Sequence, residues 1–226
     1  MEYPTGTVTF LFTDIEGSTK LAQEHPDAMP ALLARHHEIL NQSIQAQNGF
    51  VFQIVGDSFS AAFHSASDAL HAALDAQRLL QNESWSPAPI KVRMGIHTGA
   101  AQLNNNSDQT IYSGYTTLAL TQRIMSAGHG GQILLSGATR ELVRDVLPPD
   151  TELLDLGEKR LKDLMRPEHL YQFNISGLLA TFPPLKTLDL LPNNLPVQLT
   201  SFVGRENEIT ELKQALTPSP LLRERD

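Results

Sequence analysis

The chain has 226 residues, with 25 acidic and 17 basic side chains, a formal net charge of -8 and no cysteine. This length allows one medium-sized domain with a substantial core, plus additional segments. The acidic balance and the lack of a basic stripe argue against a nucleic-acid partner, because phosphate neutralisation dominates such binding. The absence of cysteine excludes disulfides and thiolate metal sites. Without a long apolar run or a signal-peptide pattern, we expect a soluble cytoplasmic chain with no membrane partner.

The first predicted element is a buried strand, Thr7 to Phe12, which is rich in β-branched and aromatic side chains. Asp14 stands where this strand ends, and Gly17 follows in a small-residue turn that leads into a helical run over residues 20–24. A carboxylate at the end of a buried strand, followed by a turn with free N–H groups, is suited to hold a divalent metal ion beside a phosphate. The alternative is that Asp14 only caps the helix.

A second acidic turn follows a predicted amphipathic helix over residues 27–47. Strands over 50–55 and 58–63 form a predicted hairpin, with Asp57 at its tip. Turn chemistry alone can explain an aspartate at this position. Two strand-end aspartates in one small domain are less readily explained by turns. If Asp14 and Asp57 meet, they can hold two metal ions a few ångströms apart, an arrangement that serves phosphoryl chemistry.

The rest of the pattern alternates helices with strands. We predict helices over residues 65–82, 112–126 and 138–146, and strands over residues 90–96, 132–136, 153–156 and 169–173. This order predicts an α+β domain with a mainly antiparallel sheet whose helices cover one face. Prolines punctuate the segment after residue 174, and we predict an extended linker over residues 175–200.

Five segments resemble, in order, the motifs of the class III nucleotidyl cyclase catalytic domain. They are Phe10–Thr19, Val55–Phe59, Val92–Gly99, Arg123–Gln132 and Leu161–Leu164. Each motif is weak alone, but the ordered set is specific, and the resemblance covers residues 5–174. It implies a ferredoxin-like sheet covered by helices. It also implies a head-to-tail homodimer in which each site draws residues from both chains.

The resemblance implies a role for each matching residue. Asp14 and Asp57 would bind two Mg²⁺ or Mn²⁺ ions together with the main-chain carbonyl of Ile15. Arg123 would stabilise the transition state, although it could also be an ordinary solvated helix arginine. Lys162 would bind phosphate, although it could also be a solvated lysine of the loop. The N–H groups of Glu16, Gly17, Ser18 and Thr19 would bind phosphate as well. The implied reaction converts a nucleoside triphosphate, ATP by default, into a 3′,5′-cyclic nucleotide and pyrophosphate in intracellular signal transduction.

Three positions depart from the family pattern. The lysine expected four residues before the second metal aspartate is Gln53. The polar residue expected eleven positions before Arg123 is Tyr112, and the asparagine expected four before it is Ala119. We therefore expect intact metal and phosphate handling but altered base reading and ribose orientation. Two hypotheses stand: a working cyclase with unorthodox base recognition, or a degenerate homologue that acts as a dimerising or nucleotide-sensing regulatory module.

Residues 201–226 resemble the opening segment of the ATPase module that follows cyclase domains in many bacterial regulators. The phosphate-binding glycine-rich motif expected shortly afterwards does not occur in the sequence. We therefore expect residues 201–226 to be a truncated opening segment that forms no independent domain. An ATPase module is an expected partner only in longer relatives.

Overall fold

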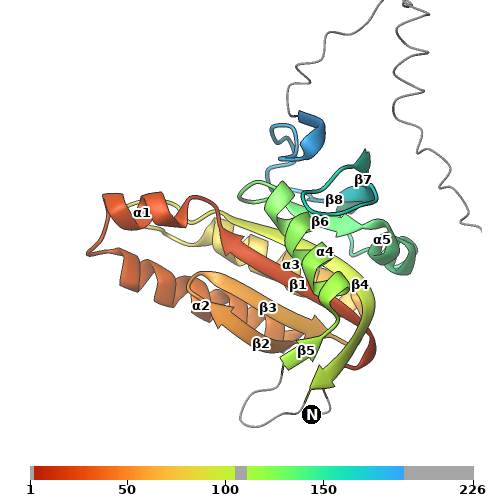
Figure 1. Cartoon of the computed structure of the whole chain (residues 1–226). Coiled ribbons are helices and arrows are strands. Elements are labelled where there is room, and N and C mark those ends of the chain that lie inside the picture. Colours follow the sequence, from red (N-terminus) through yellow and green to blue (C-terminus); the bar gives the residue numbers. More distant parts are fainter. Residues whose placement is uncertain (1–2, 105–110, 191–226) are drawn as a thin grey trace, which may run out of the picture. The chain divides into compact units, whose positions relative to one another are not determined.

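The computed structural model describes residues 3–104 and 111–190, which form one sheet with helices packed against it (Figure 1). The strands are β1 (Gly6–Ile15), β2 (Phe50–Val55), β3 (Ser58–Phe63), β4 (Val92–Asn104), β5 (Ile111–Ser113), β6 (Ile133–Ser136), β7 (Thr151–Lys159) and β8 (Glu168–Ile175). The helices are α1 (Ser18–Glu24), α2 (Met29–Ala46), α3 (Ala66–Asn82), α4 (Tyr115–Ala127), α5 (Gly137–Val143) and the 3-10 turn η1 (Leu188–Leu190).

The sheet has the strand order β2-β3-β1-β4-β6-β8-β7, and β5 pairs with the far end of β4. All described pairs are antiparallel except β4 with β6, which run parallel. The α+β class and the mainly antiparallel sheet predicted from the sequence are therefore confirmed. The β2–β3 hairpin has the predicted bounds, because its apolar runs and its glycine-containing turn are local signals.

The strand β1 lies inside the sheet and is buried on both faces, which explains its nearly continuous apolar sequence. Phe10 and Phe12 belong to the cluster on one face, and Leu11 and Ile15 belong to the cluster on the other. The strand runs three residues beyond the predicted end at Phe12. Asp14 is therefore still part of the strand and has a fixed partner in β4.

The helices cover both faces of the sheet, not one face as the sequence predicted. α2, α3 and α5 pack with Leu11 on the larger core, whereas α4 packs with Phe10 on the opposite face. Gly95 in β4 permits this second layer, because a Cβ atom at this position would lie 2.5 Å from the main-chain nitrogen of Met125 in α4. Glycine is thus required where the helix backbone approaches the sheet.

The prediction that a helix begins at Tyr112 is wrong, because Tyr112 lies in β5 and α4 begins at Tyr115. Gly114, with φ of 147°, separates the strand from the helix. The Tyr112 side chain is 3% exposed and packs among the aromatic rings on the α4 side of the sheet. Its hydroxyl donates a 2.7 Å hydrogen bond to the carbonyl of Pro4. These contacts join segments far apart in sequence, so local periodicity could not reveal them.

The segment after β8 returns to the domain. We name residues 178–190 the C-terminal strap. Leu185 is 7% exposed in a cluster with Ile124 and Leu161, and the N–H of Lys186 donates to the carbonyl of Ala127 at 2.9 Å. The sequence predicted an extended linker here, but the described part packs on the domain, because Leu178 and Leu185 fill apolar positions there. Residues 191–200 and the predicted opening segment 201–226 lie outside the described residues.

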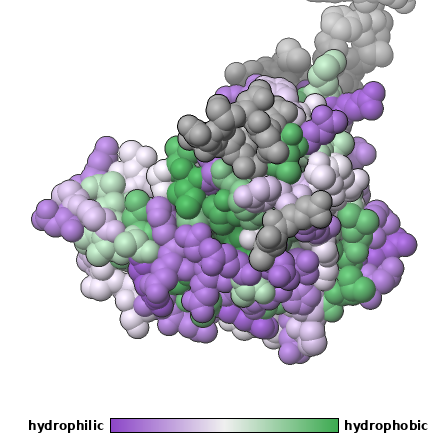
Figure 2. Space-filling model, turned by 90° about the horizontal axis from the view of Figure 1, so that it is seen from below, coloured by the Kyte–Doolittle hydropathy of each residue, from purple (hydrophilic) through white to green (hydrophobic). Residues whose placement is uncertain are grey.

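Exposed apolar side chains occur at several places on the described surface. Ile54 and Val55 flank the hairpin tip, Tyr115 begins α4, and Met165 lies between β7 and β8. Viewed from below, hydrophilic residues cover much of the molecule and hydrophobic residues gather in patches between them (Figure 2). Within the described ranges, none of the helices has the length and apolar character that crossing a membrane requires.

Candidate active site

The structure brings the two sequence-predicted aspartates together at one end of the sheet. The Asp57 carboxylate accepts a 2.8 Å hydrogen bond from the N–H of Ile15, the residue that follows Asp14. This contact arises because β1 and β3 are antiparallel neighbours, so the hairpin turn lies beside the end of β1. Asp14 does not cap α1, since the N-cap residue is Gly17 and this described helix end has no side-chain cap hydrogen bond.

Arg93 of β4 holds the Asp14 carboxylate in a two-pronged ion pair. Its Nε lies 2.6 Å from Oδ1 and its Nη2 lies 2.8 Å from Oδ2, and the two residues are opposite each other in the β1–β4 register. The hydrogen bond with Asp14 raises the pKa of Arg93, and the charges of Glu16 and Asp57 add to this effect against the cost of burial. Arg93 is therefore a permanent cation among three carboxylates.

Sequence reasoning missed the role of Arg93, because it placed the residue only in the predicted strand over residues 90–96. The available signal was its place inside the Val92–Gly99 motif, on a strand that also had to pair with β1. The register that sets Arg93 opposite Asp14 is a tertiary feature. A pattern within either strand cannot supply it.

Glu16 is tied to segments more than seventy residues away. Its N–H donates to the carbonyl of Lys91 at 2.9 Å, and its Oε2 accepts the N–H of Gly130 at 2.9 Å. Its Oε1 accepts a hydrogen bond from Lys186 Nζ and lies 3.6 Å from Nδ1 of His129. Burial raises the pKa of Glu16, but the hydrogen bonds from Lys186 and Gly130 outweigh it, so the pKa is lowered. The turn after Asp14 thus carries a negative side chain in an anchored position.

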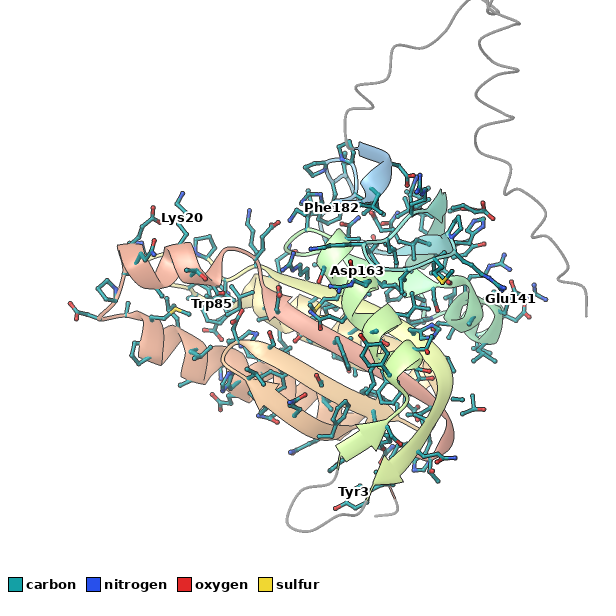
Figure 3. All side chains as sticks on the ribbon, viewed as in Figure 1. Tyr3, Lys20, Trp85, Glu141, Asp163 and Phe182 are labelled. Atoms are coloured by element: carbon teal, nitrogen blue, oxygen red, sulfur yellow. The ribbon has the colours of Figure 1, made fainter. Side chains whose placement is uncertain are left out.

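Arg123 and Lys162 form a separate group. The Nη2 of Arg123 on α4 donates a 2.6 Å hydrogen bond to Asp163, which is the neighbour of Lys162 in the loop between β7 and β8. Figure 3 labels Asp163 close to α4. Neither cation has a recorded contact with Asp14 or Asp57 in the described part of the chain. One chain therefore presents the acidic and the basic predicted residues as two groups.

The three departing positions differ in their surroundings. Gln53 is exposed on β2, just after an irregularity in the pairing with β3. Ala119 is half-buried on α4 and offers no polar side-chain atom. Tyr112 contacts Phe10 and Phe52 edge-on, with ring centroids 5.2 and 4.9 Å away. Burial, together with the charge of Tyr3, raises the pKa of Tyr112 to about 12. Tyr112 is therefore a core residue of its own chain.

The chain therefore has a mixed sheet with helices on both faces, and Asp14 and Asp57 lie together beside its inner strands. Residues 1–175 match the family described as the adenylate and guanylate cyclase catalytic domain, and the chain belongs to that family. The resemblance on the five motifs is thereby confirmed. The attachment to an ATPase module stays a prediction.

Relatives and solved structures agree with this assignment. An uncharacterised protein of Mycobacterium tuberculosis is 42% identical over 92% of this chain and 70% of its own length. A receptor-type adenylate cyclase of Trypanosoma congolense is 29% identical over 80% of this chain and 29% of that protein. Trypanosoma brucei adenylate cyclase, solved in its monomeric state, superposes with a TM-score of 0.72 at 27% identity, covering 83% of this chain and 97% of the other. The adenylyl cyclase CyaB of P. aeruginosa shares the fold, with a TM-score of 0.67 at 24% identity over 80% of this chain and 100% of that chain.

The residues at the end of β1 fit a divalent metal ion. Asp14 and Asp57 offer carboxylate oxygens, which are the donors that Mg²⁺ and Mn²⁺ prefer. The described residues contain no group of three or more histidine, cysteine or acidic side chains arranged for a metal. This is compatible with Mg²⁺, which commonly uses one or two carboxylates and takes its other ligands from substrate phosphates and water.

Proposed function

We propose that this chain is a cyclase that converts a nucleoside triphosphate, ATP by default, into a 3′,5′-cyclic nucleotide and pyrophosphate in the cytoplasm. The observation that supports it best is the hydrogen bond from the N–H of Ile15 to Asp57, which joins the two aspartates at one place. Asp14, Asp57 and the carbonyl of Ile15 would hold two Mg²⁺ or Mn²⁺ ions. When bound, these ions supply the charge that activates the ribose 3′-hydroxyl and holds the departing pyrophosphate.

The chain's own residues would then bind and orient the triphosphate. Arg93 donates one hydrogen bond to each carboxylate oxygen of Asp14, so a metal ion there would use the remaining lone pairs or displace the arginine. In either case the guanidinium would lie next to the phosphates and attract them. Further phosphate contacts would come from the N–H groups of Gly17, Ser18 and Thr19. The sequence also predicted the N–H of Glu16 for this role, but that N–H already donates to the carbonyl of Lys91 at 2.9 Å.

Arg123 and Lys162 would complete the site from the second chain of a homodimer. In the attack of the 3′-oxygen on the α-phosphorus, the bond to the bridging oxygen of pyrophosphate breaks, and negative charge grows on the phosphate oxygens. A guanidinium placed there stabilises this charge. The separation of the acidic and basic groups within one chain supports this division between two chains.

A second candidate function is that of a degenerate homologue which binds nucleotide or dimerises without turnover. Tyr112 favours it, because the residue at the expected base-reading position is 3% exposed and its hydroxyl is bonded to Pro4. Ala119 adds to this, since a methyl group cannot orient a ribose by hydrogen bonding. Loss of each positioning group can cost two to three decades of rate, roughly.

The test combines turnover with binding. Purified chain is incubated with Mn²⁺ and each of the four ribonucleoside triphosphates, and cyclic product is identified by mass spectrometry. Binding of Mn²⁺ with a non-hydrolysable ATP analogue is measured by calorimetry for the wild type, Asp14→Asn, Asp57→Asn and the double variant. Because the two carboxylates act as a unit, each single variant should lose nearly as much affinity as the double variant.

Asp145→Asn is the matched control, because Asp145 is an exposed aspartate at the end of α5. It removes one charge from the surface and should leave affinity and product formation unchanged. Cyclic product supports the cyclase, and metal-dependent binding without product supports the degenerate homologue. Equal affinity in the wild type and all three site variants would refute the cyclase and the nucleotide-binding form of the degenerate homologue.

A further inference from the structure

The C-terminal strap lies beyond the family domain, which ends at residue 175, yet it reaches the candidate site. Lys186 Nζ donates a hydrogen bond to Glu16, two residues after Asp14. The match to the Mycobacterium tuberculosis relative covers 92% of this chain and therefore takes in residues 178–190 as well. Figure 1 shows the 3-10 turn η1 of the strap lying next to the sheet strands β7 and β8.

The position of Lys186 is fixed by its own main chain. Its N–H donates to the carbonyl of Ala127 at 2.9 Å, and the preceding Leu185 is buried in an apolar cluster. Two residues later, the N–H of Leu188 donates to the carbonyl of Arg160 at 2.9 Å, and Asp189 accepts the N–H of Arg160 at 2.9 Å. The lysine is therefore presented from an anchored segment, which lowers the entropy cost of its ion pair.

The charge of Glu16 matters because of its neighbours. Glu16, Asp14 and Asp57 all act on Arg93, so the three carboxylates lie within electrostatic reach of one cation. Metal ions would neutralise the aspartates, but Glu16 would remain as a negative side chain beside a triphosphate. Like charges at such range disfavour binding. The described structure balances Glu16 with Lys186 and fixes its other oxygen with the N–H of Gly130.

We propose that Lys186 is a positioning residue for the nucleoside triphosphate, which neutralises and holds Glu16 from outside the cyclase domain. The proposal rests on the proposed function, since it assumes that a triphosphate binds beside Asp14. Lys186 and Glu16 are both partly exposed, at 43% and 34%, so solvent screens their interaction. Its removal should therefore weaken triphosphate binding by roughly fivefold rather than by orders of magnitude.

The experiment uses the full chain with the substitutions Lys186→Met, Lys186→Arg and Lys20→Met. Lys20→Met is the matched control, because Lys20 is 78% exposed on α1 and pairs with Glu24 instead of Glu16. Figure 3 labels Lys20 on α1 and Phe182 in the strap, on separate elements. Calorimetry with Mn²⁺ and the non-hydrolysable ATP analogue gives Kd.

Lys186→Met should raise Kd about fivefold, and where turnover is measured it should raise KM while leaving kcat unchanged. Lys186→Arg should restore the wild-type Kd and KM. In a Glu16→Gln background the effect of Lys186→Met should be smaller, because the part that acts by neutralising Glu16 is gone and only the direct attraction of Lys186 for the phosphates remains.

The proposal is overturned if Lys186→Met binds like the wild type, if Lys20→Met loses as much, or if the loss is undiminished in the Glu16→Gln background. A wild type without any affinity for the analogue refutes the proposed function and, with it, the role of Lys186 towards nucleotide. A wild type that binds, with a variant that binds equally well, refutes only the role of Lys186.

Discussion

His36 makes the stability of this domain sensitive to acid. The side chain is fully buried on α2, packs edge-on against Phe59 with ring centroids 5.8 Å apart, and has no hydrogen-bond partner for either ring nitrogen among the described residues. Burial lowers its pKa from 6.5 to about 4; the charge of His37 acts in the same direction and that of Asp57 against it. Because the folded-state pKa lies below the unfolded value, the unfolded state binds the proton more readily. His36 therefore leaves the free energy of unfolding unchanged above pH 6.5 and lowers it as the pH falls towards 4.

The magnitude follows from these two pKa values. At pH 7 the histidine is largely neutral in both states and contributes almost nothing. At pH 5 the unfolded chain has bound a proton and the folded chain has not, which costs about 2 kcal/mol of the free energy of unfolding. His97 is buried with a pKa lowered to about 4 by burial alone, so it adds a similar and independent loss. The free energy of unfolding of a typical domain is roughly 5–15 kcal/mol, so the losses from His36 and His97 together are a large part of it.

His36→Leu isolates the first contribution. Urea unfolding of the wild type and the variant at pH 7 and pH 5 should show a loss on acidification that is about 2 kcal/mol smaller in the variant. At pH 7 the variant should be as stable as the wild type or slightly more stable, because an unpartnered polar ring is replaced by an apolar side chain of similar size. An equal loss in wild type and His36→Leu would refute the argument.

Two further predictions concern the candidate site. Arg93→Met should lower stability by about 2 kcal/mol, seen as a Tm lower by roughly 4–8 °C, because Asp14 loses its partner. Mn²⁺ should raise the Tm of this variant more than that of the wild type, and equal shifts would contradict the competition between Arg93 and metal. Analytical ultracentrifugation should show self-association at micromolar concentration, strengthened by nucleotide and Mn²⁺, since neither chain alone joins the acidic and basic groups. A monomer under all conditions would contradict the two-chain site.

Much of the fold could be predicted from the sequence because its signals are local. The apolar runs on both sides of Asp57 and its tight turn define the β2–β3 hairpin completely. The meeting of Asp14 with Asp57 was also within reach, because each aspartate lies at the end of a predicted strand. Their catalytic role stays a prediction, as do those of Arg123 and Lys162.

The missed features depend on contacts between distant segments. The sequence around Tyr112 is compatible with a helix. Its ring contacts with Phe10 and Phe52 nevertheless stabilise it in a short strand. Arg93 acquires its partner only through the β1–β4 register. Lys186 follows two prolines that typify a linker, and its position depends on Leu185 finding an apolar site between α4 and the β7–β8 loop. In each case tertiary packing outweighs local propensity.

The site has the residues expected for metal and phosphate binding but lacks those expected for base and ribose recognition. Nucleotide binding and cyclisation can therefore occur separately in this chain. Metal and phosphate contacts are shared by every nucleoside triphosphate, and the residues expected to make them are present at the end of β1. Base discrimination needs buried polar groups that a wrong base would leave unpaired, and such groups can reject an analogue by roughly 10⁴-fold. Here Gln53 is exposed, Tyr112 is in the core and Ala119 has no polar group, so this chain should bind ATP and GTP with similar affinity. Cyclisation in addition needs an oriented ribose, and Ala119 removes the expected means of orienting it. Binding without turnover is therefore a coherent outcome of this site, and turnover, where found, would require the ribose to be oriented by groups outside the family pattern.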